Sequence, residues 1–75
     1  MDTTFDAIRD ETDYSGQNLA GADFRGCDFE GANFTGCILT DCIFTGAYLK
    51  SAKLAGAILD GATLQGAHLE MAILT

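Results

Sequence analysis

The stretch Ala22-Asp23-Phe24-Arg25-Gly26 determines the architecture of the chain, because its pattern of side chains recurs every five residues almost to the last residue. The third position of each such pentad holds a large residue, and the series has no interruption. We predict that these residues form the core of the protein: Tyr14, Leu19, Phe24, Phe29, Phe34, Leu39, Phe44, Leu49, Leu54, Leu59, Leu64, Leu69 and Leu74.

Two further positions of the pentad are almost as restricted. From Ala22 onward, the first position holds only alanine or cysteine. The fifth position holds every glycine of the chain, and only Asp41, Ser51 and Met71 replace glycine there. A small residue, a large residue and a turn residue thus follow one another at fixed spacing.

A period of five residues excludes an ordinary helix and a flat strand. In a helix, successive large residues would lie about 140° apart and form no apolar stripe. In a strand, an odd step would send them to opposite faces. The chain must therefore bend once per pentad, and glycine tolerates the backbone angles of such a bend. Repeated bends of one hand predict a solenoid with the large side chains inside.

Three pentads carry a resemblance to a known family. Ala22-Asp23-Phe24-Arg25-Gly26, Ala32-Asn33-Phe34-Thr35-Gly36 and Ala57-Ile58-Leu59-Asp60-Gly61 resemble the A(D/N)LxG motif of the pentapeptide-repeat family. The resemblance covers roughly residues 12 to 75. It implies an all-β fold, a right-handed quadrilateral β-helix with four pentads per coil. Thirteen pentads, the last cut short, then give just over three coils.

The resemblance weakens at the second position of the later pentads, where the polar residue of the motif is replaced. The replacements are Ile38, Ile43, Tyr48, Lys53, Ile58, Thr63, His68 and Ile73. With four pentads per coil, residues twenty apart stack on one another. Ile38 and Ile58 then align on one face, with Ile43 on the next, and these three isoleucines form a candidate docking strip. Outward isoleucines also suit strand propensity alone, so this alternative stays open.

Residues 1–11 lie outside the repeat, and we expect residues 12–75 to form a single β-helical domain. Phe5 and Ile8 are three residues apart and would share one face of a short helix, for which Thr3 or Thr4 could be the cap. We expect this helical segment to cover the open top of the first coil, because an uncovered coil exposes apolar side chains and strand edges. The alternative is a frayed terminus.

The three cysteines are an odd number and occupy the small inward position, which argues against a disulfide framework. The spacing of Cys27, Cys37 and Cys42 matches no zinc site. We therefore expect three reduced, buried thiols that behave like slightly larger alanines, and no metal or other cofactor. Reduced thiols favour a cytoplasmic location. The sequence contains neither an apolar run of membrane-spanning length nor a secretory signal sequence.

The net charge of −7 is concentrated in one part of the chain. Residues 1–41 carry nine acidic and two basic side chains, whereas residues 42–75 carry two of each. This acidity argues against direct binding to nucleic acid or to an anionic membrane. Register also aligns Asp28, Tyr48 and His68 in one outward column. A convex face without a nucleophile makes catalysis there implausible, and the sequence predicts no enzyme.

The C-terminal end shows no segment comparable to residues 1–11. Leu59, Leu64 and Leu69 would lie at the edge of the final coil, beside a candidate self-association edge formed by Met71, Ile73 and Leu74. An open apolar edge is a liability for a monomer, and a two-fold contact would bury it in both chains. We therefore expect a homodimer through the C-terminal coil, or else a fragment of a longer array.

Two functions are compatible with these patterns. The first is a non-catalytic scaffold or protein–protein interaction module with an unidentified protein partner. The second comes from the resemblance: some members of the family mimic duplex DNA, bind DNA gyrase and related type II topoisomerases, and protect them from quinolone-type poisons. The acidic residues of this chain do not form continuous columns, since Asp23 would lie over Ile43 and Thr63. The interaction module is therefore favoured over the DNA mimic.

Overall fold

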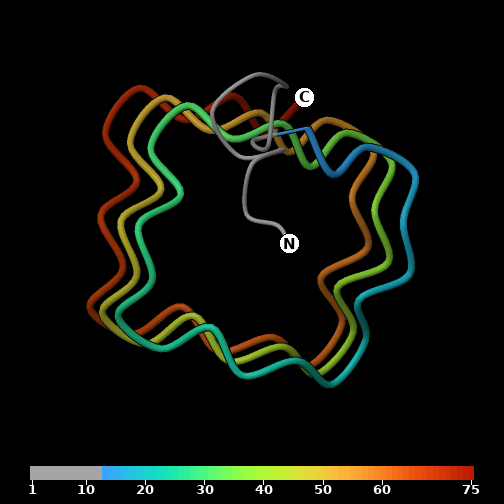
Figure 1. The fold of residues 1–75 in the computed structure, drawn as a ribbon, viewed down its shortest axis with the longest axis horizontal. Helices are drawn as coiled ribbons and strands as arrows, with labels where there is room; N and C mark the ends of the chain where they lie inside the picture. The colour runs from blue at the N-terminus through green and yellow to red at the C-terminus, as the bar shows by residue number, and fades with distance from the viewer. Residues whose placement is uncertain (1–12) are drawn as a thin grey trace, which may run out of the picture.

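The computed structural model describes residues 13–75, which wind into stacked four-sided coils (Figure 1). The first coil comprises residues 13–31, the second residues 32–51 and the third residues 52–71, and residues 72–75 begin another turn. No helix occurs within residues 13–75, and the strand content consists of single-residue β-bridges. The expected helical cap over residues 1–11 lies outside the described residues.

The stacking register is twenty residues, as the four pentads per coil implied by the family resemblance predict. Nine parallel bridges join residues that are twenty apart, so four pentads complete each coil. The bridged positions form four outward columns, which we number in chain order. The first column is Asp13, Asn33, Lys53 and Ile73; the second is Asn18, Ile38 and Ile58; the third is Asp23, Ile43 and Thr63; the fourth is Asp28, Tyr48 and His68.

Main-chain hydrogen bonds connect each coil to the next on all four sides. The amide of Phe24 donates to the carbonyl of Ile43 over 2.8 Å, and the amide of Ile43 donates to Ala22 over 2.9 Å. The amide of Gly26 adds a third bond, to Thr45. The same pattern repeats from pentad to pentad, so the backbone groups of a short segment are satisfied without a long strand.

Each corner of a coil is a β-turn that runs from the large residue of one pentad to the first residue of the next. The amide of Cys27 donates to the carbonyl of Phe24 over 3.1 Å, which places Gly26 third in the turn with φ of 68°. A positive φ at this position is the signature of a type II turn and explains the preference for glycine.

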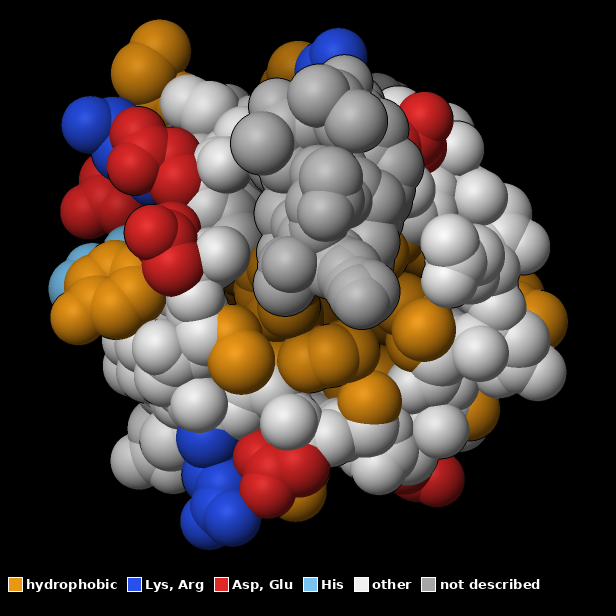
Figure 2. All heavy atoms as spheres, viewed as in Figure 1, with side chains coloured by type: hydrophobic (Ala, Val, Ile, Leu, Met, Phe, Trp, Pro, Cys, Tyr) orange, Lys and Arg blue, Asp and Glu red, His pale blue; other side chains and the backbone are white. Residues whose placement is uncertain are grey.

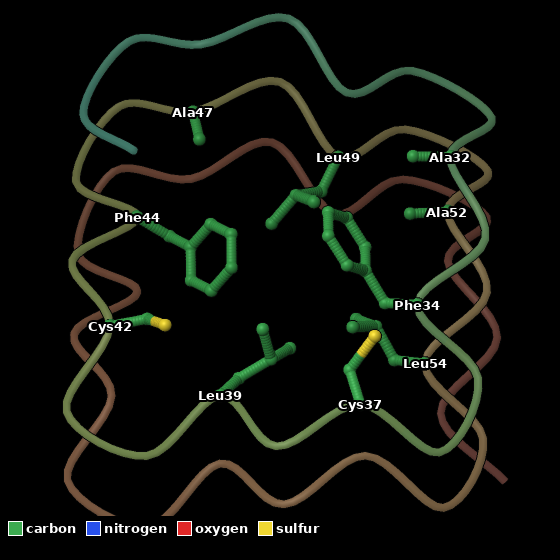
Figure 3. Packing of buried hydrophobic residues seen from close by; sticks show 10 residues of the cluster. All are labelled: Ala32, Phe34, Cys37, Leu39, Cys42, Phe44, Ala47, Leu49, Ala52 and Leu54. Atoms are coloured by element: carbon green, nitrogen blue, oxygen red, sulfur yellow. The ribbon is translucent and has the colours of Figure 1, made fainter. Parts of the chain in front are cut away.

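The core is formed chiefly by the second coil, which is covered on both sides. Ten fully or almost fully buried residues point into the interior (Figure 3): Ala32, Phe34, Cys37, Leu39, Cys42, Phe44, Ala47, Leu49, Ala52 and Leu54. Packed against them from the first and third coils are seven of the predicted core residues, each partly buried: Tyr14, Leu19, Phe24, Phe29, Leu59, Leu64 and Leu69.

One predicted core residue lies elsewhere. Leu74 is 58% exposed and does not belong to the buried cluster. It occupies the inward position of its pentad, but residues 72–75 only begin a turn, and no other part of residues 13–75 covers its side chain. The periodic pattern identifies the inward direction at this position, while burial depends on the coil beneath.

Aromatic rings fill the upper part of the core. Tyr14 stacks on Phe34 with ring centroids 5.1 Å apart and planes 13° from parallel. Phe29 meets Phe34 edge to face at 5.1 Å and Phe24 in the same manner at 5.0 Å. Such contacts stabilise aromatic pairs beyond the burial of their area. From Leu49 onward the inward position holds leucine only.

Two of the three cysteines are wholly buried, and all three are free thiols. The sulfur of Cys37 lies 2.9 Å from the carbonyl oxygen of Tyr14, and that of Cys42 lies 3.0 Å from Leu19. Each thiol thus donates a weak hydrogen bond to the coil above it, which alanine could not do. Cys27, in the first coil, is only half-buried.

Candidate interaction surface

The outward positions change character between the first coil and the coils that follow. Five bridged residues near the start of the chain carry an amide or carboxylate that accepts a hydrogen bond from the backbone two residues later: Asp13, Asn18, Asp23, Asp28 and Asn33. This arrangement is an Asx-turn, which fixes the outward bend by a local contact. From Ile38 onward the bridged positions hold no aspartate or asparagine.

Asp23 makes the strongest polar contact of the first coil. Arg25 donates to it through Nε over 2.9 Å and through Nη2 over 2.7 Å. These side-chain hydrogen bonds are the main reason why the pKa of Asp23 is lowered from its ordinary value of 3.8, and the hydrogen bond from the backbone amide of Arg25 lowers it further. The hydroxyl and then the amide of Ser15 lower the pKa of Asp13 in the same way. Asp23 and Arg25 form the sole ion pair between residues of the described range 13–75.

The candidate docking strip is only partly assembled. Ile38 and Ile58 bridge one another in the second column, as the register predicts. Ile58 is 46% exposed, whereas Ile38 is half-buried. Ile43 is also half-buried and lies in the third column, between Asp23 and Thr63. The three residues therefore span two neighbouring faces, and Ile58 contributes most of the exposed apolar surface.

The fourth column contains a contact that sequence reasoning missed. The rings of Tyr48 and His68 stack with centroids 4.8 Å apart and planes 4° from parallel. Both side chains are exposed, Tyr48 by 50%. The register places the two residues together, but a stacked pair requires matching rotamers that the spacing alone does not reveal.

Charged side chains surround this aromatic pair. Asp28 bridges Tyr48 from the first coil, and Glu30, Lys50 and Glu70 occupy the adjacent outward positions of the same face. Figure 2 shows the single histidine of the chain, in pale blue, beside a hydrophobic side chain and close to acidic and basic groups. Three carboxylates and one ammonium group give this face a negative charge.

The corner that follows this face is strained. Ser51 and Met71 stack at the corner below Gly31 and have φ of 63° and 62°. Residues other than glycine avoid this left-handed region because Cβ approaches the following carbonyl oxygen. Met71 is 78% exposed, so burial of its side chain does not offset the strain. The absence of glycine at positions 51 and 71 was the sequence signal for this strain.

The candidate self-association edge lies at the lower end of the solenoid. Ile73 is 48% exposed and Leu74 is 58% exposed, and both follow Met71 directly around the corner. The amide of Ile73 donates to Ala52, which attaches this short segment to the third coil. Three exposed apolar side chains therefore lie within four consecutive residues.

The remaining surface of residues 13–75 is convex. No pocket opens within this range, and no group of three or more His, Cys, Asp or Glu side chains is arranged to hold a metal ion there. The described part of the chain contains no helix able to cross a lipid bilayer. Any recognition by these residues must therefore use side chains on the outer faces, corners or ends of the coils.

Comparison with known proteins is consistent with this geometry. The family model described as "Pentapeptide repeats" matches this chain over residues 11–41 and 42–75, with eight copies of the repeat. A pentapeptide repeat protein of known structure, Rfr23 from the cyanobacterium Cyanothece 51142, is 25% identical with a TM-score of 0.82. That match covers 84% of this chain and 44% of the Rfr23 chain, so this protein spans less than half of its length.

A second similar structure is HetL, a pentapeptide repeat protein involved in heterocyst differentiation regulation from the cyanobacterium Nostoc sp. strain PCC 7120. It is 29% identical, with 83% of this chain and 34% of HetL covered, at a TM-score of 0.29. A search of curated protein sequences finds no match. The family pattern nevertheless extends over nearly all of the sequence, and the chain belongs to the pentapeptide-repeat family, whose fold is a right-handed β-helix.

Proposed function

We propose that this protein is a non-catalytic scaffold or protein–protein interaction module. The observation that carries the proposal is the exposure of large apolar side chains on a convex solenoid: Tyr48, Ile58, Met71, Ile73 and Leu74. Proteins of this family are generally structural or interaction proteins, and their fold supplies a rigid rod with variable outer faces. The fold itself does not identify the partner.

The main-chain hydrogen bonds between coils do not depend on which side chains occupy the outward positions. The same hydrogen bonds join the coils whether the bridged residue is Asp23, Ile43 or Thr63. The outer faces can therefore vary in sequence without loss of the coil, and exposed aromatic or apolar groups there are available for contact with another protein.

Photo-crosslinking in cells tests this proposal. A photoreactive amino acid placed in turn at Tyr48, Lys53, Ile58 or Thr63 samples all four columns at outward positions. We expect one protein to be captured reproducibly from one face or from two neighbouring faces, and not from the others. Failure to capture any protein from all four faces would contradict an interaction role for the outer surface.

We further propose self-association through the edge formed by Met71, Ile73 and Leu74. Contact between two such edges would bury three exposed apolar side chains in each chain and would close after two copies. Ile73→Glu or Leu74→Glu should shift the protein toward monomer, whereas Ile58→Glu, on a lateral face, should leave the dimer intact. Analytical ultracentrifugation that shows a monomer at about 100 μM would exclude a dimer of ordinary affinity.

A DNA mimic that binds DNA gyrase is the alternative, and the net charge of −7 favours it. The bridges oppose it, because Asp23 is followed in its column by Ile43 and Thr63, and Asp28 by Tyr48 and His68. Duplex DNA presents its charges along its whole length. Protection of gyrase from a quinolone in a supercoiling assay would favour the mimic over the interaction module.

We also propose that the protein acts in the cytoplasm. Cys27, Cys37 and Cys42 are unpaired, and two of them are sealed in the core. Free thiols are typical of reducing compartments, where disulfides rarely persist. Fractionation of cells that express a tagged copy would show whether the protein is found there.

A further inference from the structure

The Tyr48–His68 pair forms an aromatic platform on the outer surface. The rings are parallel and separated by 4.8 Å, which is the spacing between coils, so each ring continues the stacking direction of the solenoid. On the opposite side of Tyr48, the bridged residue is Asp28, whose short side chain reaches less far from the backbone than a phenol ring. Because Tyr48 is 50% exposed, the outer part of its ring remains accessible beyond Asp28.

Carboxylates lie on the same face as this ring. The Oδ1 atom of Asp28 accepts a hydrogen bond from the amide of Glu30 over 3.1 Å, and its Oδ2 atom has no hydrogen-bond partner within residues 13–75. Glu30 itself follows at the adjacent outward position of the first coil, with Lys50 below it in the second. A ring face with a carboxylate one coil away matches the two requirements of a planar cation, an aromatic surface and a hydrogen-bond acceptor.

The neighbouring corner supplies a third observation. Met71 adopts φ of 62°, a backbone angle that is unfavourable for any residue with a Cβ atom, and the residue is 78% exposed. Glycine occupies this turn position in most pentads and would relieve the strain. Strained residues with exposed side chains cluster at functional sites, and methionine adapts readily to the aliphatic part of a partner's side chain.

We propose that the face formed by Asp28, Glu30, Tyr48, His68 and Met71 docks an arginine-bearing segment of a partner protein. The guanidinium group would lie against the exposed part of the Tyr48 ring, on the side of the first coil, and donate hydrogen bonds to Asp28 and Glu30. Met71, in the third coil, would contact an apolar side chain elsewhere on the same segment. Arginine fits better than lysine, because a planar guanidinium stacks on rings and bonds carboxylates in a forked manner. The negative charge of the face excludes a polyanionic ligand. This inference rests on the proposed interaction function and specifies the chemistry of the partner.

Nuclear magnetic resonance titration tests the proposal with the full chain and a defined probe. The probe is the capped peptide Arg-Gly-Arg-Gly-Arg, with Lys-Gly-Lys-Gly-Lys and Glu-Gly-Glu-Gly-Glu as controls. We expect the arginine peptide to shift resonances of residues 28–30, 48–50 and 68–71, the lysine peptide to bind more weakly, and the glutamate peptide to cause no shifts. Equal shifts from the arginine and lysine peptides, spread over all acidic residues, would overturn the proposal.

Matched variants separate stacking on the Tyr48 ring from general electrostatic attraction between the arginine peptide and the acidic protein. Tyr48→Thr removes the ring, whereas Ile58→Thr removes a side chain of similar exposure from the second column. We expect Tyr48→Thr to weaken arginine-peptide binding at least about threefold, and Ile58→Thr to leave it unchanged. Asp28→Asn keeps the acceptor of the Asx-turn but removes the charge, and should also weaken binding. If all three variants bind the peptide like the wild-type chain, the proposed site is wrong.

Crosslinking distinguishes a failure of this docking face from a failure of the proposed interaction function. Crosslinking that captures a partner from Ile58 or Thr63, but not from a photoreactive residue at Lys50 beside the intact Tyr48 ring, would support an interaction module and reject this docking face. Capture from position 50 that is abolished by Asp28→Asn, together with arginine-peptide binding, would support both.

Discussion

The first and third coils have the same backbone and almost opposite side-chain chemistry. In the first coil, the bridged positions are aspartates and an asparagine whose side chains hold the following bend, and the core is largely aromatic. In the third coil, the bridged positions are Lys53, Ile58, Thr63 and His68, and the core is leucine. Both coils nevertheless bridge the second coil in the same register.

Comparison of these two coils identifies the parts of the pentad that the fold requires. The inward large residue and the turn with positive φ are present throughout, whereas the Asx-turn ends after Asn33. Local side-chain support for the bend is therefore optional once main-chain bonds to a neighbouring coil are in place. The outward residues of the second and third coils are free to serve other purposes.

The largest effect should come from the shared core between the coils. Phe34 is wholly buried and stacks on Tyr14, whereas Leu69 in the third coil is only partly buried. Phe34→Ala should lower the free energy of unfolding by about 3–5 kcal/mol, and Leu69→Ala by about 2 kcal/mol, because a buried cavity cannot collapse fully. Urea denaturation of both variants provides the measurement.

Thr35→Ala is the matched outward control for the Phe34 variant. Thr35 is exposed, and its amide retains the bond to Asn33 after the substitution. Its cost should stay below about 0.5 kcal/mol. Equal losses for Phe34→Ala and Thr35→Ala would contradict the inward and outward assignment.

The residue spacing alone predicted the repeat, the coiled form of the chain and the direction of nearly every large side chain. These features follow from the spacing of residues such as Phe24, Phe34 and Phe44, because the backbone can satisfy that spacing in few ways. Four-sidedness and handedness came from the family resemblance. Burial could not be predicted residue by residue, since Leu74 and Leu54 have the same pentad position but differ in what covers them.

Thiol reactivity should distinguish the first coil from the second. Cys27 is half-buried, whereas Cys37 and Cys42 are wholly buried and donate to backbone carbonyls. In native buffer, a thiol reagent should label Cys27 at least about tenfold faster than the other two, because they require local opening. Mass spectrometry after timed labelling gives the three rates, and uniform fast labelling would contradict the packing of the second coil.

The candidate site was less predictable than the core. The register brought Asp28, Tyr48 and His68 together, and this followed from the spacing of twenty. The parallel stacking of two rings depends on rotamers, and the accessible part of a ring depends on its neighbours. The sequence placed Ile43 on the face next to that of Ile38 and Ile58, but its half-buried state depends on its neighbours and could not be predicted from the spacing.

Two substitutions at turn positions should change the free energy of unfolding by intermediate amounts and in opposite directions. Gly46 has φ of 70°, and an added Cβ would meet nothing within 4 Å, so Gly46→Ala isolates the cost of the backbone angle. We expect a loss of about 1–2 kcal/mol. Met71→Gly should instead stabilise the third coil by about 0.5–1 kcal/mol, because relief of strain exceeds the entropy that glycine loses.

Thermal melts of the two turn variants provide the comparison. Ser51→Gly is the matched variant at the same corner, with φ of 63° in the parent residue. A destabilising effect of Met71→Gly, with a stabilising effect of Ser51→Gly, would show that the Met71 side chain contributes packing despite its exposure.

The smallest effect should be a pH dependence confined to the first coil. Arg25 holds the pKa of Asp23 below its ordinary value of 3.8, so the carboxylate binds fewer protons in the folded than in the unfolded chain. Its contribution to stability is therefore fully present above about pH 4 and is lost as the pH falls through the lower folded pKa.

Asp23→Asn keeps the acceptor for the Arg25 amide but cannot ionise. The variant should consequently be slightly less stable than the parent at pH 7, and the difference should shrink as the pH falls through the folded pKa of Asp23. Thr63→Asn, in the same column of the third coil, should change stability equally across this pH range, because no carboxylate is removed. Melts across this range test the contrast, and a constant difference between Asp23→Asn and the parent would show that the ion pair contributes nothing on this exposed surface.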